Sequence, residues 1–313
     1  MTKRVVATAA GGPEVLELVE EPDRDPGPAE VLIEVRAAGV NPVDAKRYAR
    51  ASGSAHFPMA LGFEAAGVVL AVGSDASGPR GPVADGDDVI AYRIDGAYAD
   101  RVVVPADAVV PKPTALAWEP ASGLMLTGAT AIHALTVVDV GPGDTVLLHG
   151  AAGGVGIMAT QLAVDRGARV IGTAREANQD FLRGLGAEPV TYGDGLLERV
   201  RAVAPDGVDA AIDAAGTPEA LEVSLALVEL TTRCTTIVAR KAAFDAGIHV
   251  LGGAPGADPG TEIRNAARLE LVDRVAAGTL EVVVAGTYPL AAAADAHREV
   301  MGGHVRGKVV LVP

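Results

Sequence analysis

Hydrophobic positions follow two different periods along this 313-residue chain. In the first third, short apolar runs are separated by Pro and Gly. Residues 30–37 (EVLIEVRA) alternate between polar and apolar positions, as half-buried strands do. This pattern predicts a β-rich region with strands at residues 4–7, 15–19, 30–37, 67–73, 88–92 and 99–104.

After Pro113 the pattern changes, and strand-like runs alternate with helical stretches up to about Gly256. Strands separated by helices form a doubly wound parallel sheet, so the predicted fold is α/β. A β-rich domain at 1–117, to which 260–313 returns, is expected beside a parallel-sheet domain at 118–259. The expected later elements are strands at 145–149, 169–173, 189–191, 208–213, 235–239, 249–252 and 308–312, and a helix near 262–277.

The stretch 146–163 (VLLHGAAGGVGIMATQLA) joins an apolar strand, a glycine turn and a helix. This is the order of elements in a Rossmann dinucleotide-binding unit. Glycines in the turn let the backbone approach a pyrophosphate, and the first N–H groups of the helix face the anion. We therefore predict a dinucleotide site at Gly153, Gly154, Val155 and Gly156.

The end of the second strand indicates which dinucleotide binds. NAD enzymes usually place an acid there for the ribose 2′-hydroxyl, whereas this chain has Thr173 and Arg175 and no carboxylate before Glu176. A hydroxyl and a guanidinium suit a 2′-phosphate. The pattern favours NADPH, although a solvated arginine at a strand end is the alternative interpretation of Arg175.

Composition narrows the class of protein. A net charge of −14 argues against nucleic acid and anionic membrane surfaces as partners. The single cysteine, Cys234, excludes a disulfide framework and a cysteine zinc cage, and is expected to be buried and inert. No run of 18 apolar residues occurs, and residues 1–4 lead into a strand. We expect a cytoplasmic protein.

Several separated motifs occur in a fixed order: AGVNPVD (38–44), LGFEAAGVV (61–69), DGDDV (85–89), GAYA (96–99), TGATA (127–131) and GKVVL (307–311). With them the chain resembles the zinc-independent medium-chain dehydrogenase/reductases, in the group of quinone oxidoreductases and enone reductases. The resemblance implies a GroES-like catalytic domain, a Rossmann domain and a homodimer formed by edge-to-edge pairing of the Rossmann sheets.

Zinc alcohol dehydrogenases of this superfamily have Cys where Asn41 stands and His where Phe63 stands. The remaining Glu64 is expected to have a structural role as part of a pair. Without a zinc Lewis acid, an unactivated alcohol is a poor substrate. The resemblance therefore implies hydride transfer to a quinone or an α,β-unsaturated carbonyl such as an enone or 2-alkenal. Reduction of enoyl thioesters in biosynthesis and NADPH binding with little turnover are the alternatives.

Three residues in the segment 41–48 (NPVDAKRY) are catalytic candidates. Asn41 resembles the family asparagine near the nicotinamide, and its amide can donate to a carbonyl or to the cofactor. Lys46 matches a lysine of enone reductases and can stabilise an enolate, or it is simply solvated. Tyr48 lies two residues on and would point elsewhere on a helix. Tyr92 is a further possible donor, or packs as an ordinary tyrosine.

Further cofactor residues follow from the resemblance: Thr130 near the nicotinamide, Tyr192 against the 2′-phosphate, and Gly252 and Gly253, which close the last Rossmann strand, where the backbone contacts the nicotinamide. Segment 231–238 lacks the glycine that this family normally has before its strand.

Arg240 and Lys241 follow that segment, and they either recognise an anionic acceptor or form a solvated pair. His56, His297 and His304 are predicted at the surface, and His133 falls in a helical pattern.

Overall fold

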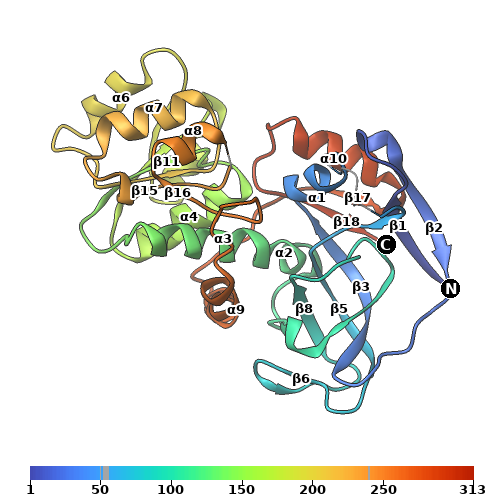
Figure 1. Cartoon of the computed structure of the whole chain (residues 1–313). Helices are drawn as coiled ribbons and strands as arrows, with labels where there is room; N and C mark the ends of the chain where they lie inside the picture. The colour runs from blue at the N-terminus through green and yellow to red at the C-terminus, as the bar shows by residue number, and fades with distance from the viewer. Residues whose placement is uncertain (50, 52–55, 239) are drawn as a thin grey trace. The chain divides into compact units, whose positions relative to one another are not determined.

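The computed structural model describes residues 1–49, 51, 56–238 and 240–313 (Figure 1). The chain forms two compact units. The first consists of Met1–Leu126 and Arg268–Pro313, and the second of Thr127–Ala267. In the described part of the chain, no helix combines the length and apolar character needed to cross a bilayer.

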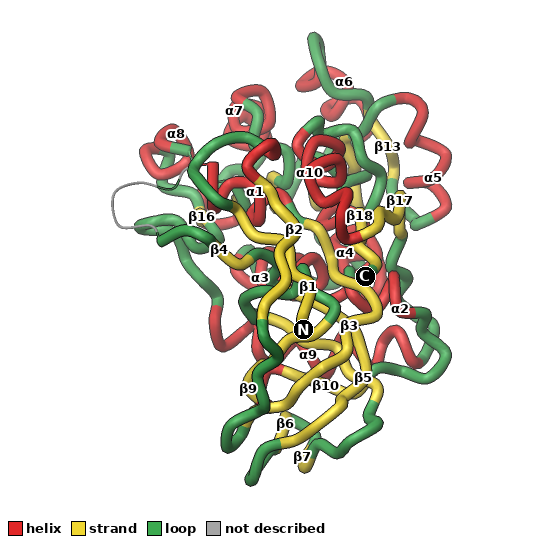
Figure 2. The backbone as a smooth tube through the Cα atoms, turned by 90° about the vertical axis from the view of Figure 1, so that its right-hand side faces the viewer, coloured by secondary structure: helices red, strands yellow, loops and turns green. Residues whose placement is uncertain are grey.

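Seven strands form the main sheet of the first unit, in the order β10-β8-β5-β3-β18-β17, with β9 also paired to β3. Polar and apolar residues alternate along β3, so its apolar side chains enter the core while Glu34 and Arg36 stay partly or fully exposed. β18 pairs antiparallel with β3 and thereby completes the sheet. The strands, visible as the main body of the unit in Figure 2, are β3 (Glu30–Val40), β5 (Glu64–Val72), β8 (Asp88–Tyr92), β9 (Arg101–Pro105), β10 (Val109–Pro111), β17 (Val284–Pro289) and β18 (Lys308–Val312).

Smaller elements complete the first unit. A three-stranded sheet has the order β2-β1-β4, and β6 pairs with β7. Helix α1 packs against α10. The bounds are β1 (Thr2–Ala7), β2 (Leu16–Glu21), β4 (Met59–Ala60), β6 (Ser77–Gly78), β7 (Gly81–Pro82), α1 (Pro42–Ala49), α2 (Trp118–Ser122), α10 (Ala293–Met301) and 3-10 turns at Pro13–Val15, Ala106–Ala108 and Leu290–Ala292.

The second unit is built on a six-stranded parallel sheet of order β13-β12-β11-β14-β15-β16. The order reverses beside β11, which places the switch point of the sheet at the glycine turn. Helices α6, α7 and α8 lie on one face, and α3 and α4 on the other (Figure 1). The strands are β11 (Thr145–His149), β12 (Arg169–Thr173), β13 (Glu188–Val190), β14 (Ala210–Asp213), β15 (Cys234–Thr236) and β16 (His249–Val250).

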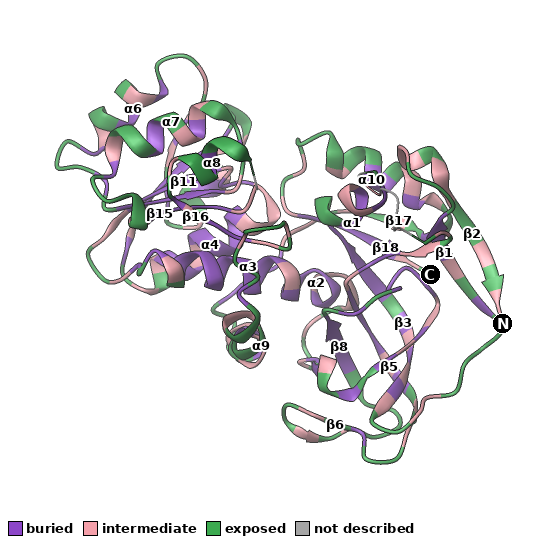
Figure 3. Cartoon of the chain, viewed as in Figure 1, coloured by how far each residue is buried: buried purple, intermediate pink, exposed green. Residues whose placement is uncertain are grey.

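Burial differs between the two helical layers of this unit. Helix α3 is almost entirely buried, as expected from its apolar sequence, whereas α8 exposes most of its residues (Figure 3). The helices are α3 (Leu124–Val137), α4 (Gly154–Asp165), α5 (Gln179–Gly184), α6 (Leu196–Val203), α7 (Pro218–Leu227) and α8 (Lys241–Asp245), with 3-10 turns at Glu176–Asn178 and Thr231–Arg233. Helix α9 (Thr261–Ala276) begins in this unit and ends in the first, and α3 begins in the first.

The predicted α/β class and the alternation of strand and helix after Pro113 are confirmed. The predicted strand at 235–239 is wrong at its end, because β15 stops at Thr236 and residues 237 and 238 form a bend; Ala239 lies outside the described residues.

Candidate active site

The glycine turn between β11 and α4 has almost no space for side chains. Gly150 has a φ of +73°, which favours glycine, and a Cβ on Gly156 would lie only 2.2 Å from the carbonyl oxygen of Gly150. Gly153 is the N-cap of α4 and, as a glycine, has no side chain that could cap this helix end. The amino end of α4 can therefore receive an anion through its backbone N–H groups.

The carboxyl ends of β12 and β13 bring two candidate residues to the same edge. Thr173 pairs with Val190 in parallel register, so Arg175 and Tyr192 each lie two residues beyond that pair. Arg175 is exposed and Tyr192 is 46% exposed. Thr173 is buried, and its hydroxyl accepts a hydrogen bond of 3.2 Å from the N–H of Gly150. Thr173 thus fixes the glycine turn, while the side chains of Arg175 and Tyr192 are exposed to solvent at the same edge.

The carboxylate of Asp213 closes the turn after β14. Its Oδ1 accepts from the N–H groups of Ala215 and Gly216 at 2.9 and 2.7 Å, and its Oδ2 accepts from the Thr236 hydroxyl at 2.9 Å. A cavity of about 450 Å³ begins here. Its lining combines apolar residues such as Leu221 and Val238 with charged ones, namely Glu222 and both members of the predicted basic pair, Arg240 and Lys241.

The segment that lacks the family glycine forms a 3-10 turn at Thr231–Arg233. The guanidinium of Arg233 forms an ion pair of 2.8 Å with Asp144 and donates to the carbonyl of Asp139. Cys234 follows, and burial raises the pKa of its thiol to about 11. The thiol is therefore protonated near neutral pH, as expected for a buried, inert cysteine.

In the first unit, a buried lysine connects three strands. The Lys308 ammonium donates to Asn41 Oδ1 at 2.5 Å, to Glu64 Oε1 at 2.9 Å and to the carbonyl of Val40 at 3.2 Å. Asn41 Nδ2 donates to the same Glu64 oxygen at 3.0 Å. The N–H of Leu126 donates to the other carboxylate oxygen at 2.8 Å. These bonds satisfy all three ammonium protons inside the protein, and they confirm that Glu64 is part of a pair.

A second buried network starts three residues later. Asp44 Oδ2 accepts from the N–H of Asn41 at 2.8 Å, as in a capping box, and from the Tyr98 hydroxyl at 3.0 Å. The ring of His297 bridges the hydroxyls of Tyr98 and Tyr48 at 3.1 and 3.0 Å. Because the Tyr98 proton goes to Asp44, the Nε2–H of His297 donates to Tyr98 and the Tyr48 hydroxyl donates to Nδ1.

Burial controls the charge of this network. Loss of solvent raises the pKa of Asp44 to about 7, although Asn41, Tyr98 and Lys308 oppose the shift. Burial also lowers the pKa of His297 to about 4, so its ring is neutral near pH 7. The prediction that His297 lies at the surface is wrong, because it is completely buried. His56 and His304 are exposed, as predicted.

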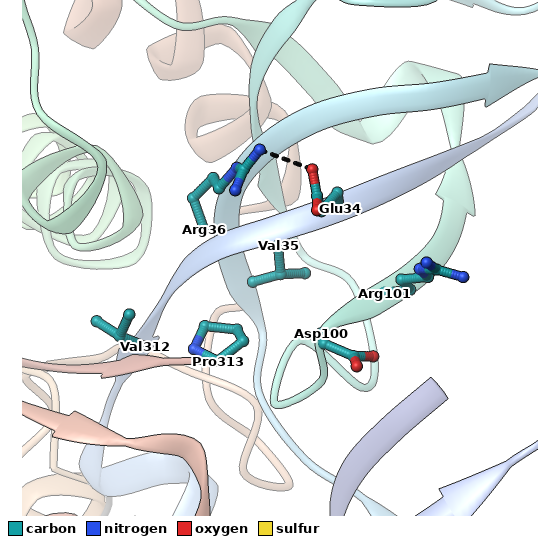
Figure 4. Close-up of a pocket in the computed structure, with 7 residues that line it drawn as sticks. All are labelled: Glu34, Val35, Arg36, Asp100, Arg101, Val312 and Pro313. Atoms are coloured by element: carbon teal, nitrogen blue, oxygen red, sulfur yellow. Dashed lines mark ion pairs between the residues drawn. The ribbon is translucent and has the colours of Figure 1, made fainter. Parts of the chain in front are cut away.

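A shallow surface cavity of about 320 Å³ lies beside β3, away from these residues. Figure 4 shows that Arg36 and Glu34 at its rim point toward one another, and they form an ion pair of 2.7 Å. Charged side chains also come from Asp100 and Arg101. None of the predicted site residues lines this cavity.

The sequence comparisons match this architecture. A model of the alcohol dehydrogenase GroES-like domain matches residues 27–114, and a model of the zinc-binding dehydrogenases matches residues 185–311. Quinone oxidoreductase of Pseudomonas aeruginosa is 31% identical over 334 positions, which cover 100% of both chains. The chain belongs to the quinone oxidoreductase group of the medium-chain dehydrogenase/reductases.

Two further proteins match over the whole of this chain. The crystal structure of Escherichia coli quinone oxidoreductase complexed with NADPH has a TM-score of 0.87 and 28% identity, covering 100% of both chains. A 2-haloacrylate reductase of a Burkholderia species is 31% identical over 355 positions, covering 100% of this chain and 99% of its own. The predicted combination of a GroES-like domain and a Rossmann domain is thereby confirmed.

The catalytic candidates of this member of the quinone oxidoreductase group differ in burial and in hydrogen bonding. Lys46 is half-buried, whereas Tyr48 is 1% and Tyr92 is 3% exposed. The hydroxyl of Tyr48 is bound by His297, so we withdraw Tyr48 from the candidate proton donors. Asn41 is also buried, and its amide protons point to Glu64 and to the carbonyl of Gly39. Its predicted role as a donor to substrate is therefore not supported.

Two buried residues of the first unit were missed by the sequence analysis. Lys308 was noted only within the GKVVL motif, because a lysine in a strand is usually solvated. Asp44 was noted only as the last residue of the AGVNPVD motif, and nothing local indicates that Tyr98 would bind it. Thr130 of the second unit is 5% exposed on α3. The predicted strand at 249–252 is too long, because β16 ends at Val250, and Gly252 and Gly253 lie in the loop beyond it.

Proposed function

We propose that this protein is an NADPH-dependent oxidoreductase that transfers hydride, without zinc, to a quinone or an α,β-unsaturated carbonyl. The main support for NADPH comes from the carboxyl edge of β12 and β13. Arg175 and Tyr192 lie at this edge, and no acid occurs there before Glu176. A guanidinium and a phenol can bind a 2′-phosphate, which an acid would repel. The E. coli structure, complexed with NADPH, supports this choice of cofactor.

The residues of the second unit fit this cofactor. The amino end of α4, from Gly153 to Gly156, would hold the pyrophosphate, and Arg175 and Tyr192 would hold the 2′-phosphate. Gly252 and Gly253 would lie against the nicotinamide half, because a Cβ on either glycine would meet only open space. NADPH supplies the hydride when it is bound.

The proposal that zinc takes no part rests on the cluster around Lys308. Asn41 and Phe63 stand where zinc alcohol dehydrogenases have a thiolate and an imidazole. The oxygen of Asn41 and one oxygen of Glu64 already bind the Lys308 ammonium. An acceptor for hydride must then be electrophilic by itself, as quinones and enones are.

Lys46 is the side chain that we propose to stabilise the negative oxygen formed when hydride adds to an enone. It is half-buried on α1, the helix whose start Asp44 and Asn41 fix. An ammonium near a developing oxyanion stabilises the transition state more than the ground state. Lys46→Ala should lower kcat for enones, and unchanged kcat and KM would remove Lys46 from the mechanism.

Purified protein should be assayed for NADPH oxidation with a benzoquinone, a 2-alkenal, a cyclic enone, an enoyl thioester and 2-chloroacrylate, with NADH in parallel. We expect turnover of at least one acceptor and a preference for NADPH. The enoyl thioester tests the biosynthetic alternative, and the chloroacrylate tests anion recognition by Arg240 and Lys241. NADPH binding without oxidation by any acceptor would contradict the reductase proposal.

We also propose a homodimer that pairs the Rossmann sheets edge to edge. The edges of this sheet are β13 and β16, because every other strand has two neighbours. Light scattering coupled to gel filtration should give twice the chain mass of 31.5 kDa. A monomeric mass at micromolar concentration would contradict this arrangement.

A further inference from the structure

The loop after β16 is closed at its neck by backbone hydrogen bonds. The N–H of Asp258 donates to the carbonyl of Val250, and the N–H of Gly252 donates to the carbonyl of Asp258, both at 2.8 Å. Leu251 and Asp258 form a β-bridge at the same place. We call residues 251–260 the neck loop. Because it begins where β16 ends, it emerges at the carboxyl edge of the parallel sheet.

A histidine of another element holds this neck. His133 lies on α3 and is completely buried. Its Nε2 is 3.0 Å from Asp258 Oδ2, and the Nε–H of Arg264 donates to its Nδ1 at 3.2 Å. The guanidinium N–H can only donate, so Nδ1 is the acceptor and the ring proton lies on Nε2. The Nε2–H of His133 therefore donates to the Asp258 carboxylate.

The end of the neck loop is fitted to the same ring. Gly260 has a φ of +56°, and a Cβ on it would lie 2.2 Å from the ring of His133. The other oxygen of Asp258 accepts from the N–H of Gly260 at 2.8 Å. The imidazole thus contacts the loop at two positions, through a hydrogen bond to Asp258 and through close packing against Gly260. An alanine at 260 could not take this position.

The glycines inside the loop have a different environment. A Cβ on Gly252 or Gly253 would meet no atom within 4 Å. Gly252 has a φ of +133°, and this backbone conformation favours glycine. At Gly253 neither the φ angle nor the packing of neighbouring atoms requires a glycine. A ligand that approaches the backbone closely would explain it. The loop therefore has a fixed neck and a segment that is open to a ligand.

We propose that His133 is a positioning residue that holds the neck loop in the conformation that binds the nicotinamide half of NADPH. This inference rests on the proposed cofactor. His133 does not itself touch the ligand, and it acts through Asp258. Without the tether, binding must order the loop, so affinity falls for the nicotinamide half and is unchanged for the adenosine half.

The test compares two ligands, NADPH and 2′,5′-ADP, which lacks the nicotinamide half. In His133→Leu we expect the Kd of NADPH to rise about ten-fold, the effect of losing one charge-assisted hydrogen bond, while the Kd of 2′,5′-ADP stays the same. His133→Gln should restore NADPH binding, because its amide can donate to Asp258 and accept from Arg264. Asp206→Ala removes an exposed acid from the loop before β14, at the opposite edge of the sheet, and serves as the control.

Amide hydrogen exchange without ligand gives an independent readout. Residues 251–260 of His133→Leu should exchange faster than in the parent protein, while β11 and α4 keep their protection. If His133→Leu does not fold, Asp258→Ala removes the same tether from a half-exposed side chain and should show the same selective loss.

Unchanged NADPH affinity and loop exchange in these variants, or an equal loss for both ligands, would overturn the inference. Failure of the parent protein to bind NADPH would instead overturn the proposed function, and the exchange data would still test the tether.

Discussion

Replacing Asp44 by Asn removes a buried negative charge and keeps the shape of the side chain. Asp44 is completely buried in the first unit. One oxygen accepts from the N–H of Asn41 and the hydroxyl of Tyr98, while Oδ1 has no polar partner among the described residues. The amide oxygen of Asn can accept both bonds. The amide nitrogen then takes the place of the unpartnered oxygen, and no charge is buried.

The magnitude follows from the shift of the Asp44 pKa from 3.8 to about 7. Because the folded-state pKa is raised, the folded protein binds a proton more tightly than the unfolded chain does. The stability contributed by this group is fully present below pH 3.8 and is lost as the pH rises toward 7. At about 1.4 kcal/mol per pH unit, the ionised carboxylate costs about 4 kcal/mol above pH 7, as an upper limit.

Urea unfolding followed by tryptophan fluorescence can measure this effect, because the single tryptophan, Trp118, lies in the same unit as Asp44. We expect the free energy of unfolding of Asp44→Asn, relative to the parent protein, to increase by about 2 kcal/mol between pH 5.5 and 7. The difference between the unfolding free energies of the variant and the parent protein cancels the contributions of the other titrating groups, which both proteins share. Asp85→Asn, which changes an exposed carboxylate of the same unit, is the matched control and should give a flat difference.

A difference that stays constant from pH 5.5 to 8.5, with equal m-values, would refute the reasoning. It would mean that Asp44 is already ionised in the folded protein at pH 5.5, and that the hydrogen bonds from Asn41 and Tyr98 compensate for the loss of solvent around the carboxylate. Asp44→Ala provides a further check. It removes the acceptor of two buried donors and also lacks the charge, so it should be less stable than Asp44→Asn at every pH, by about 1–3 kcal/mol.

Three further substitutions test other parts of the structure. Lys308→Met leaves the carboxylate of Glu64 buried without its cation, so urea unfolding should show a loss of about 3–5 kcal/mol; an unchanged midpoint would contradict the buried pair. Arg175→Ala should raise the KM for NADPH about ten-fold or more and leave that for NADH unchanged. Equal changes for both cofactors would exclude a 2′-phosphate contact. Gly156→Ala places a Cβ against the Gly150 carbonyl, and isothermal titration should detect no dinucleotide binding. Binding as tight as in the parent protein would show that this turn can relax.

Local patterns predicted much of the fold. The strands at 88–92, 145–149, 169–173 and 308–312 have the predicted bounds, because each is a compact apolar run between turn residues. The end of β15 was not predicted, since Ile237 and Val238 have strand propensity but form a bend. At Ile237 and Val238 the chain leaves the sheet and turns, although both residue types favour strands.

The sequence predicted the glycine turn of the candidate site but not the environments of Asn41 and Tyr48, and the reason is physical. The glycine turn is a local motif, and its residues lie in one continuous segment. The environment of Asn41 depends on Lys308, which lies 267 residues away, and that of Tyr48 depends on His297, which lies 249 residues away. Spacing along a single sequence contains no information about such pairs, so the orientation of Asn41 and the burial of Tyr48 could not be predicted.

The pairing of β18 with β3 has a consequence for how the protein is made. All six strands of the parallel sheet lie between residues 145 and 250, so this sheet can form while later residues are still on the ribosome. The sheet of the first unit needs β18, which arrives after the whole second unit has been synthesised. Until then Glu64 has no ammonium partner and β3 has an open edge. During this interval the nascent chain exposes a pairing surface on which chaperones or aggregation can act.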